Sequence, residues 1–245
     1  MLEVRDLAVN YRGISAVEDV SFCLESGQLI GIIGPNGAGK STLIKAILGL
    51  VPAEHGVVTF NSRPLKQQLG TVAYVPQRSQ IDWDYPVTVW NVVMMARTLH
   101  LGWSRFPSRQ SKGLVQAALQ RVGVWELRDR QIGELSGGQQ QRVFLARALA
   151  QQAELFFFDE PFVGVDRKTE AVIFEVFGEL KSAGKTLLVI SHDLGATTQV
   201  YDHFLLLNKQ LIAEGSRDEV ITAANLREAY GESVILLERR EKERC

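Results

Sequence analysis

The residues best suited to chemistry in this chain lie in a glycine-rich segment, GPNGAGKS, at positions 34–41. Its glycines lack a Cβ, so the backbone can curl until successive N–H groups point inward at one anion. Lys40 is expected to reach the β- and γ-phosphates of a nucleotide, and the Ser41 hydroxyl is expected to hold Mg²⁺. The segment therefore predicts a phosphate-binding loop for a nucleoside triphosphate.

A phosphate-binding loop needs a strand before it and a helix after it, and the sequence predicts both. Residues 29–33 are apolar around one glycine, as a buried parallel strand would be. Residues 41–50 are predicted to form a helix, ended by Gly49 and Pro52, whose positive N-terminus would lie beside the phosphates. A glycine-rich turn matches the four specified positions by chance in roughly 1% of chains of this length. The context therefore favours the nucleotide-binding interpretation.

Two carboxylates follow another apolar run. Residues 155–158 predict a buried strand that ends in Asp159 and Glu160. Such strands deliver their last residues to the carboxyl edge of the sheet, where open α/β folds bind ligands. Asp159 could hold Mg²⁺ through water, and Glu160 could orient or deprotonate an attacking water. The alternative is a strand that simply meets solvent with two acids, but the phosphate-binding loop upstream favours catalysis.

Three further residues make weaker predictions on their own. His192 follows the predicted strand 187–190 and is expected near the γ-phosphate, although a histidine there is more often a surface or capping residue. Gln77 follows the predicted strand 72–75, and its amide could touch both Mg²⁺ and water, although a glutamine in a loop is usually only solvated. Tyr11 follows the first strand and could stack on adenine, and a half-buried strand residue is an equal alternative.

The segment LSGGQ at positions 135–139 predicts the start of another helix. Ser136 is a good N-cap, and Gly137 and Gly138 permit close approach of another backbone. The helix from Gln139 onward would offer a second positive N-terminus to a phosphate. From these five residues alone, a capped helix without a ligand remains the simpler interpretation.

Length and composition limit the function classes. The 245 residues suit one large domain or a domain with a subdomain, and 46% of them are hydrophobic. A net charge of −1 gives no electrostatic case for nucleic acid. Cys23 and Cys245 suggest neither a disulfide framework nor a zinc site, which suits a reducing cytoplasm. We expect no signal peptide and no membrane span, because charges interrupt the first twenty residues and every long apolar stretch.

Apolar periodicity predicts the remaining elements. Alternating apolar residues predict paired strands over 2–9 and 17–24, and apolar positions from about 87 to 124 recur at helical spacing. Further strands are expected at 57–60, 72–75, 155–158, 187–190, 204–207 and 210–213. Strands that alternate with helices predict an α/β core with a mostly parallel sheet.

Together these positions resemble the nucleotide-binding subunit of ATP-binding cassette (ABC) transporters, over nearly the whole chain. The family's motifs occur here in the family's order, at Tyr11, Gly34–Ser41, Gln77, Leu135–Gln139, Asp159-Glu160, Asp166 and His192. The resemblance implies an α/β P-loop NTPase core with a mostly parallel sheet and an N-terminal antiparallel β subdomain. It also implies an α-helical subdomain, at about 80–150, inserted in the RecA-like core of a single domain that spans 1–245.

The resemblance also implies the site residues. ATP would be bound by Tyr11, Gly34, Pro35, Asn36, Gly37, Ala38, Gly39, Lys40, Ser41 and Thr42. The ATP of a second copy would meet Ser136, Gly137, Gly138, Gln139 and Asp166. Mg²⁺ would be held by Ser41, Gln77 and Asp159, and hydrolysis would depend on Glu160, Gln77 and His192. Two copies would then form a homodimer that sandwiches two ATP molecules head to tail.

A finer resemblance concerns residues 80–97 and 161–166. The sequence PFVGVD after Glu160 looks like that of importers of manganese, zinc or iron-chelate metals, and DWDYP at 82–86 leans toward manganese. In this family the first of these segments lies where a membrane permease docks, through an apolar, half-exposed surface. Ordinary subdomain core is the alternative interpretation of its large apolar residues, which are Trp83, Tyr85, Trp90, Met94 and Met95.

The expected function is therefore an ATPase subunit, peripheral on the cytoplasmic face of the membrane. It would power an integral permease that imports a divalent metal ion, indirectly with an extracytoplasmic metal-binding protein and without nucleic acid. A soluble cassette protein not coupled to transport and an exporter ATPase remain alternatives. A small kinase would leave LSGGQ, Gln77 and His192 unexplained.

Overall fold

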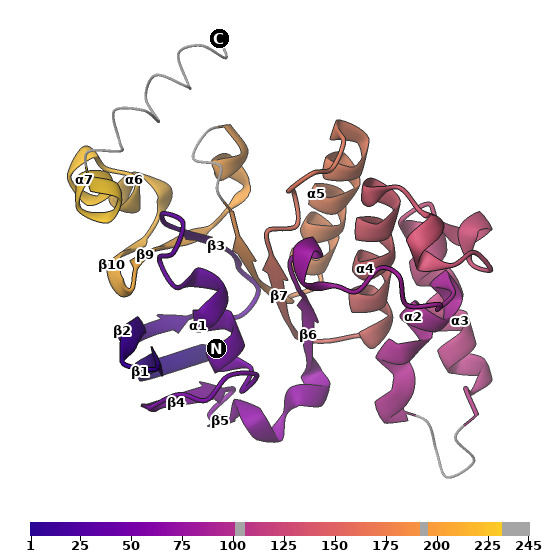
Figure 1. Cartoon of the computed structure of the whole chain (residues 1–245), viewed down its shortest axis with the longest axis horizontal. Coiled ribbons are helices and arrows are strands. Elements are labelled where there is room, and N and C mark those ends of the chain that lie inside the picture. Colours follow the sequence, from indigo (N-terminus) through magenta and orange to yellow (C-terminus); the bar gives the residue numbers. More distant parts are fainter. Residues whose placement is uncertain (101–105, 192–195, 232–245) are drawn as a thin grey trace. The chain divides into compact units, whose positions relative to one another are not determined.

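The computed structural model (Figure 1) describes residues 1–100, 106–191 and 196–231. The chain divides into two compact units. The first unit comprises residues 1–69 and 186–245, and the second unit comprises residues 70–185. The predicted helical subdomain at about 80–150 lies inside the second unit, and its boundaries stay a prediction.

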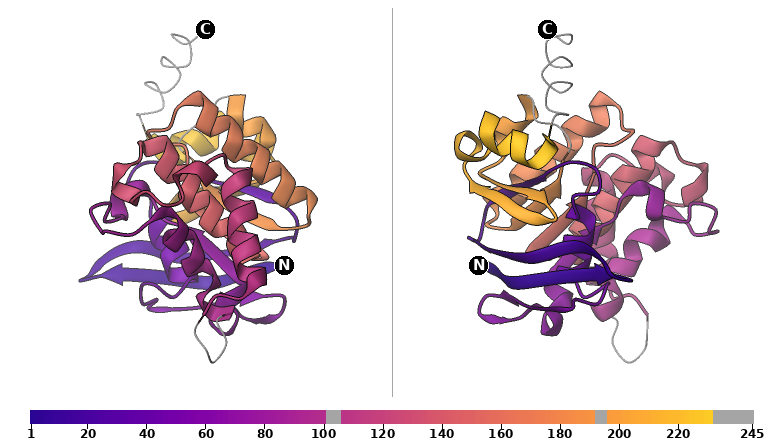
Figure 2. Two further views of the ribbon diagram at one scale, coloured as in Figure 1. Left: turned by 90° about the vertical axis from the view of Figure 1, so that its right-hand side faces the viewer. Right: turned by 60° about the vertical axis from the view of Figure 1, so that its left-hand side comes forward.

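The first unit contains an antiparallel sheet, visible in Figure 2 as the indigo and purple strands. Its strands are β1 (Leu2–Tyr11), β2 (Ile14–Leu24), β4 (His55–Phe60) and β5 (Arg63–Pro64), in the order β2-β1-β4-β5. Every neighbouring pair is antiparallel. The predicted strand pair at the N-terminus is confirmed, and Tyr11 is the last residue of β1 instead of following it.

The first unit also holds the strand that leads into the phosphate-binding loop. This strand, β3 (Leu29–Ile33), runs parallel to β8 (Thr186–Ile190) and to β9 (His203–Asn208). The last strand, β10 (Gln210–Gly215), pairs antiparallel with β9. Every residue of β3 and β8 is buried, as the continuous apolar runs predict for parallel strands covered on both faces.

The described part of the first unit contains the helices α1 (Lys40–Ile47), α6 (Arg217–Val220) and α7 (Ala223–Tyr230). The predicted end of the first of these, at residue 50, is wrong, because the helix stops at Ile47. Gly49 adopts a left-handed φ of 70° and its N–H donates to the Ala46 carbonyl at 3.0 Å. Gly49 thus ends the helix, as predicted, but it lies beyond the last helical residue because its left-handed conformation follows the final turn.

The second unit contains the parallel pair β6 (Val72–Val75) and β7 (Leu155–Asp159), together with α-helices. These helices are α2 (Val89–Met94), α3 (Arg109–Arg121), α4 (Gly137–Gln151) and α5 (Arg167–Ser182). The first three pack against one another and α4 also packs against α5, as the left panel of Figure 2 shows. No helix in the described part of the chain has both the length and the apolar character that a membrane span requires.

Polar N-caps and a core of phenylalanines position the elements of the second unit. The N-caps Thr88, Ser108 and Asp166 accept backbone hydrogen bonds at the starts of α2, α3 and α5, and each satisfies an N–H group of a first turn. Phe158 on β7 packs against Phe177 on α5, with ring centroids 4.6 Å apart. This core anchors the carboxyl end of β7, where the predicted Mg²⁺ ligand Asp159 and the predicted catalytic Glu160 lie.

Candidate functional site

The phosphate-binding loop connects β3 to α1 in the first unit. Lys40 is only 6% exposed, and its side chain turns back into the loop. Its ammonium group donates hydrogen bonds to the carbonyl oxygens of Gly34 and Pro35, both at 2.8 Å. The Lys40 ammonium group is therefore held within the loop, and Lys40 is the residue that the sequence predicts to bind phosphate.

Two glycines of the loop are required by the neighbours against which they pack. A Cβ on Gly34 would lie 2.1 Å from the carbonyl oxygen of Leu207 on β9, and a Cβ on Gly39 would lie 2.2 Å from that of Ala16 on β2. Contacts of this kind cannot be relieved by a side-chain rotation, because both neighbours are backbone atoms. The glycines thus allow the loop to pack against two strands, in addition to curling it around an anion.

The first turn of α1 is suited to an anion. Its N-cap is Gly39, at a φ of 87°, and a glycine has no side chain with which to accept a hydrogen bond from the turn. The N–H groups that open a helix lack intrahelical partners and carry partial positive charge. Ser41 and Thr42 lie in this turn, so the predicted Mg²⁺ ligand and the predicted phosphate donors share one helix end.

The structure adds Tyr230, the last residue of α7, to this part of the site. Its phenol lies near the backbone N–H of Gly34. Burial raises the pKa of Tyr230 to about 12, and the Gly34 backbone acts in the opposite direction. No sequence signal could have revealed the contact, because the two residues lie at opposite ends of the chain. The predicted adenine partner Tyr11 is 44% exposed at the end of β1.

In the second unit, Asp159 ends β7 and is 1% exposed. Tyr74 lies on the adjacent strand β6, opposite Phe157 in the parallel register. Burial, and then the negative charge of Asp159, raise the pKa of Tyr74 well above its ordinary value. A buried, ionised carboxylate is the donor that a hard cation such as Mg²⁺ favours. Sequence reasoning missed Tyr74 because it looked only like a strand residue.

Glu160 and Gln77, both predicted to be catalytic, meet in the second unit. The Gln77 side-chain Nε2 donates a hydrogen bond to the Glu160 carboxylate at 2.6 Å, across a separation of 83 residues. Glu160 has a φ of 53°, a left-handed conformation that costs a non-glycine residue roughly 1–2 kcal/mol. The strand end therefore turns sharply at the predicted base, and the carboxylate is held by an amide that adds no charge.

The LSGGQ segment forms the predicted capped helix start. The Ser136 hydroxyl accepts a hydrogen bond from the Gln139 N–H at 3.4 Å, and the Gln139 side chain accepts one from the Ser136 N–H at 2.9 Å. This reciprocal arrangement is a capping box, so Gln139 also has a structural role. Ser136 is the N-cap of α4, as predicted, and the helix begins at Gly137, two residues before the predicted Gln139.

The N-termini of α4 and α5 lie side by side. A Cβ on Gly138 would lie 2.8 Å from the Thr169 hydroxyl and 3.2 Å from a carboxylate oxygen of Asp166. Asp166 is the N-cap of α5 and accepts a hydrogen bond from the Thr169 N–H at 2.7 Å. That bond holds the pKa of Asp166 below its ordinary value. Two residues predicted to meet the ATP of a second copy, Gly138 and Asp166, are thus neighbours within one chain.

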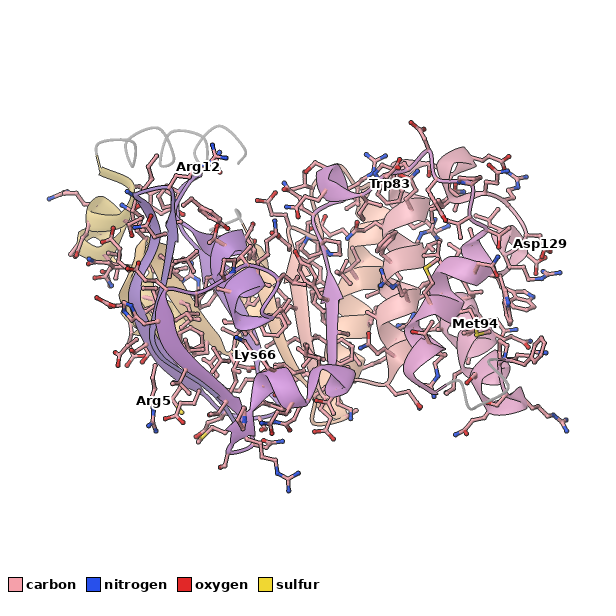
Figure 3. All side chains as sticks on the ribbon, turned by 60° about the horizontal axis from the view of Figure 1, so that its bottom comes forward. Arg5, Arg12, Lys66, Trp83, Met94 and Asp129 are labelled. Carbon is pink, nitrogen blue, oxygen red and sulfur yellow. The ribbon has the colours of Figure 1, made fainter. Side chains whose placement is uncertain are left out.

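The predicted docking segment 80–97 has mixed surroundings. Trp83, which is labelled in Figure 3, is half-buried. Its ring packs edge-on against Phe144 of α4 at a centroid distance of 5.5 Å. Met94 is buried in α2, whereas Tyr85 is 60% and Met95 is 44% exposed. The half-buried Trp90 packs against Trp125. Core packing and exposed apolar surface therefore alternate along the segment, and docking stays a prediction.

The predicted residues are divided between the units. Tyr11 and residues 34–42 belong to the first unit, whereas Gln77, Asp159, Glu160, Asp166 and the LSGGQ segment belong to the second. His192 lies outside the described residues.

Comparisons with known proteins agree with this geometry. The family model described as "ABC transporter" matches residues 17–163. The chain is 49% identical over 230 residues to the manganese transport system ATP-binding protein MntB of Halalkalibacterium halodurans, with 94% of this chain and 92% of that protein covered. It is also 49% identical to the zinc transport system ATP-binding protein TroB of Treponema pallidum, with 94% and 86% covered.

A solved structure shares the fold. An ATP-binding cassette of an ABC transporter, in its ADP conformation, superimposes with a TM-score of 0.77 at 29% identity and covers 95% of this chain and 99% of its own. These matches extend over nearly the whole length of the chain. This chain is an ATP-binding subunit of the ABC transporter family.

Proposed function

We propose that this chain hydrolyses ATP to drive a membrane permease that imports a divalent metal ion, with manganese as the first candidate and zinc or iron next. The hydrogen bond between Gln77 and Glu160, at the end of the strand that carries Asp159, is the observation that supports hydrolysis best. The neutral Gln77 amide contacts the Glu160 carboxylate, directly after the buried Asp159. Such a positioned carboxylate is suited to hold and activate a water.

Nucleotide binding is assigned to the first unit. The backbone N–H groups of residues 36–42 and the Lys40 ammonium would surround the phosphates, while Tyr11 would stack on the adenine. Lys40 already donates to two carbonyl oxygens of its own loop, so its position does not depend on a ligand. Its positive charge offsets part of the charge on the β- and γ-phosphates.

Mg²⁺ fits the chemistry of three oxygen-bearing side chains, those of Ser41, Gln77 and Asp159. Asp159 is the strongest candidate because its carboxylate is buried at the end of β7, where a bound cation would offset the cost of burying a charge. The ion, when bound, withdraws charge from the phosphate oxygens. Ser41 would hold it from the first turn of α1, as the phosphate-loop motif requires.

Hydrolysis is assigned to Glu160, Gln77 and His192. Glu160 would accept a proton from the attacking water, and Gln77 would keep the carboxylate turned toward that water. His192, which follows β8 in sequence, is proposed to contact the γ-phosphate. Each assignment comes from the motif order of the family, and the Gln77–Glu160 contact supports the first two.

A second copy of the chain would complete each site. Ser136, Gly137, Gly138, Gln139 and Asp166 are proposed to meet the ATP that is held by the partner's phosphate-binding loop. The adjacent N-termini of α4 and α5 support this, because both present partial positive charge on one side of the unit. Closure of such a dimer biases the permease only if the permease's two states differ in their affinity for the closed form.

The cargo assignment rests on relatives that are named as manganese and zinc transport ATP-binding proteins. We place this chain at the cytoplasmic face of the membrane, bound to a permease through residues 80–97. The exposed Tyr85 and Met95 side chains support that contact. An extracytoplasmic metal-binding protein would deliver the ion to the permease, so the cargo would never touch this chain.

Two substitutions test the ATPase. Glu160→Gln should reduce ATP turnover by about a thousandfold or more, because the base is lost, and should trap an ATP-bound dimer that is visible by analytical ultracentrifugation. Lys40→Ala should instead weaken ATP binding in a calorimetric titration. Undiminished turnover in Glu160→Gln would refute its role as the base, and unchanged affinity in Lys40→Ala would refute the phosphate-binding role.

The cargo is tested with the permease that co-purifies with the chain. Uptake of radioactive manganese, zinc and iron is measured in cells with the complete transporter and in cells that carry Glu160→Gln. Manganese uptake that requires an intact Glu160 supports the proposal. Loss of metal from loaded cells would indicate an exporter, and the absence of any membrane partner would favour a soluble ATPase.

A further inference from the structure

Arg78, the residue after Gln77, is bound to the helix that follows the LSGGQ segment. Its Nε and Nη2 donate hydrogen bonds to the side-chain oxygen of Gln140 on α4, at 3.1 Å and 2.8 Å. Gln140 is only 3% exposed, so its amide depends on protein partners. Because a guanidinium that uses two of its N–H groups on one acceptor fixes direction as well as distance, this contact specifies the position of the loop.

The other side of Gln140 is also held. Its Nε2 donates to the carbonyl oxygen of Ile132 at 3.1 Å, in the turn that precedes LSGGQ. Gly137 in the first turn of α4 packs so closely that a Cβ there would lie 3.1 Å from the Arg78 guanidinium carbon. Arg78 therefore touches the LSGGQ segment directly, and through Gln140 it also reaches the turn before it.

Trp83 holds Arg78 from the side of the predicted docking segment. The guanidinium carbon lies 5.5 Å from the centroid of the Trp83 ring, and the indole N–H donates to the Arg78 carbonyl oxygen at 3.0 Å. The same ring packs against Phe144 of α4. Arg78, Trp83 and Phe144 therefore form one packed cluster. The attraction between a cation and an aromatic face is stronger when the pair is partly removed from water.

Arg78 directly follows Gln77 in the chain, so its contacts can affect the proposed catalytic residues. Gln77, its immediate neighbour, donates to the carboxylate of Glu160. Two consecutive residues thus connect the proposed base on one side with the start of α4 on the other. All of these residues belong to the second unit.

We propose that Arg78 is a positioning residue that couples the Gln77–Glu160 pair to the LSGGQ segment. The inference rests on the proposed function, because it assumes that Glu160 acts on a chain's own ATP and LSGGQ on that of the partner. Under that assumption, Arg78 links the two nucleotide sites of a dimer through a single chain. Its loss lowers turnover at both sites without removing any group that touches nucleotide.

The first test separates positioning from ATP binding and from charge. In the full-length chain, Arg78→Ala should lower kcat for Mg·ATP about tenfold and leave KM within about twofold, because the nucleotide contacts stay intact. Arg78→Lys keeps the positive charge but not the fork, so it should restore only a minor part of kcat. Arg109→Ala, at an exposed arginine at the start of α3, is the matched control and should behave as the unmodified chain.

A double-mutant cycle tests the partner. Gln140→Leu removes the acceptor while conserving volume, and it should lower kcat about as much as Arg78→Ala does. The double variant should be no worse than either single variant, since both remove the same connection. Additive losses in the double variant, or full activity in Arg78→Lys, would overturn the inference. The thermal midpoint of each variant shows whether a loss of turnover reflects unfolding instead.

Mixed dimers test the link between sites. One copy carries Arg78→Ala together with Glu160→Gln, and its unmodified partner carries the only competent base. The reference dimer carries Glu160→Gln alone in the first copy. ATP at the active site then meets the LSGGQ segment of the variant copy, and turnover should fall about tenfold below the reference.

The outcomes distinguish the two proposals. If the unmodified chain hydrolyses ATP and both mixed dimers turn over equally, the proposed function stands and the role of Arg78 is wrong. If the unmodified chain hydrolyses no ATP, the proposed function is wrong and the coupling falls with it. A lower rate in the dimer with Arg78→Ala supports the coupling, because its active site retains an intact Gln77, Arg78 and Glu160.

Discussion

At the residue scale, Gly34 and Gly37 occupy one loop for different reasons. Both have left-handed φ angles, of 149° and 81°, but a Cβ would strike the Leu207 carbonyl only at Gly34, whereas nothing lies within 4 Å at Gly37. Gly34→Ala should therefore cost several kcal/mol of unfolding free energy, and Gly37→Ala only about 1 kcal/mol, which reflects its φ alone. Urea denaturation of the two variants measures the difference, and equal losses would contradict this account of Gly34.

Two half-buried tyrosines predict how stability depends on alkaline pH. Burial raises the pKa of Tyr230 to about 12, and it raises the pKa of Tyr74 further. In the unfolded chain, both tyrosines have a pKa near 10.0. Below about pH 10 both tyrosines are protonated in the folded and in the unfolded chain, so their full contribution to the unfolding free energy is present. Above it the unfolded chain releases protons that the folded chain keeps, and the unfolding free energy falls as pH rises through the folded pKa values.

Phenylalanine variants test this pH dependence. Tyr74→Phe and Tyr230→Phe should each flatten the decrease in unfolding free energy between about pH 10 and 12, because phenylalanine has no proton to release. Denaturant titrations at several pH values provide the measurement. Tyr85→Phe, at an exposed tyrosine, is the control and should keep the slope of the unmodified chain. A slope that none of the variants changes would show that other groups dominate.

At the element scale, three helical glycines should respond differently to alanine. Gly113 in α3 and Gly178 in α5 are exposed, and a Cβ at either would meet nothing within 4 Å, whereas a Cβ on Gly138 in α4 would lie 2.8 Å from the Thr169 hydroxyl. Gly113→Ala and Gly178→Ala should each raise the unfolding free energy by about 0.5–1 kcal/mol, since alanine loses less backbone entropy in a helix. Their effects should add, because they lie on different helices.

Gly138→Ala should instead destabilise the chain and lower ATP turnover, because the α4 and α5 N-termini can no longer approach each other. Thermal unfolding of the three variants decides the matter. Stabilisation by Gly138→Ala would show that Thr169 moves aside without cost.

Sequence patterns predicted the elements well where the signal was local. Buried strands, the capped start of α4 and the antiparallel N-terminal pair follow from residues that are close in the chain. Gly49 was correctly predicted to help end α1, but the predicted helix runs to residue 50 and the observed helix stops at Ile47. Gly49 is already outside the helix in a left-handed conformation, so a stop signal in the sequence locates the end of a helix only to within a few residues.

At the scale of the whole molecule, the LSGGQ segment should act only between copies. Ser136 lies in the second unit and Lys40 in the first, and the proposed dimer would place them at different ATP molecules. Ser136→Arg should therefore abolish hydrolysis and leave ATP affinity of the monomer unchanged in a calorimetric titration. Ser136→Ala, which loses mainly the helix cap at a cost of about 1 kcal/mol, separates the steric effect from a loss of stability. Weaker binding by the Ser136→Arg monomer would argue for action within one chain.

The sequence by itself determined the chemistry of this protein. The phosphate-binding loop, the acids that end β7 and the LSGGQ helix start are local motifs, because each needs only a few consecutive residues with suitable backbone freedom, charge or capping. Only the tertiary structure decided which groups from distant segments pack against these motifs and fix their positions. Gln77 on Glu160, Arg78 on Gln140, Tyr74 beside Asp159 and the Leu207 carbonyl behind Gly34 are contacts between distant segments. Such contacts depend on how strands and helices pack, and no spacing in the sequence specifies them.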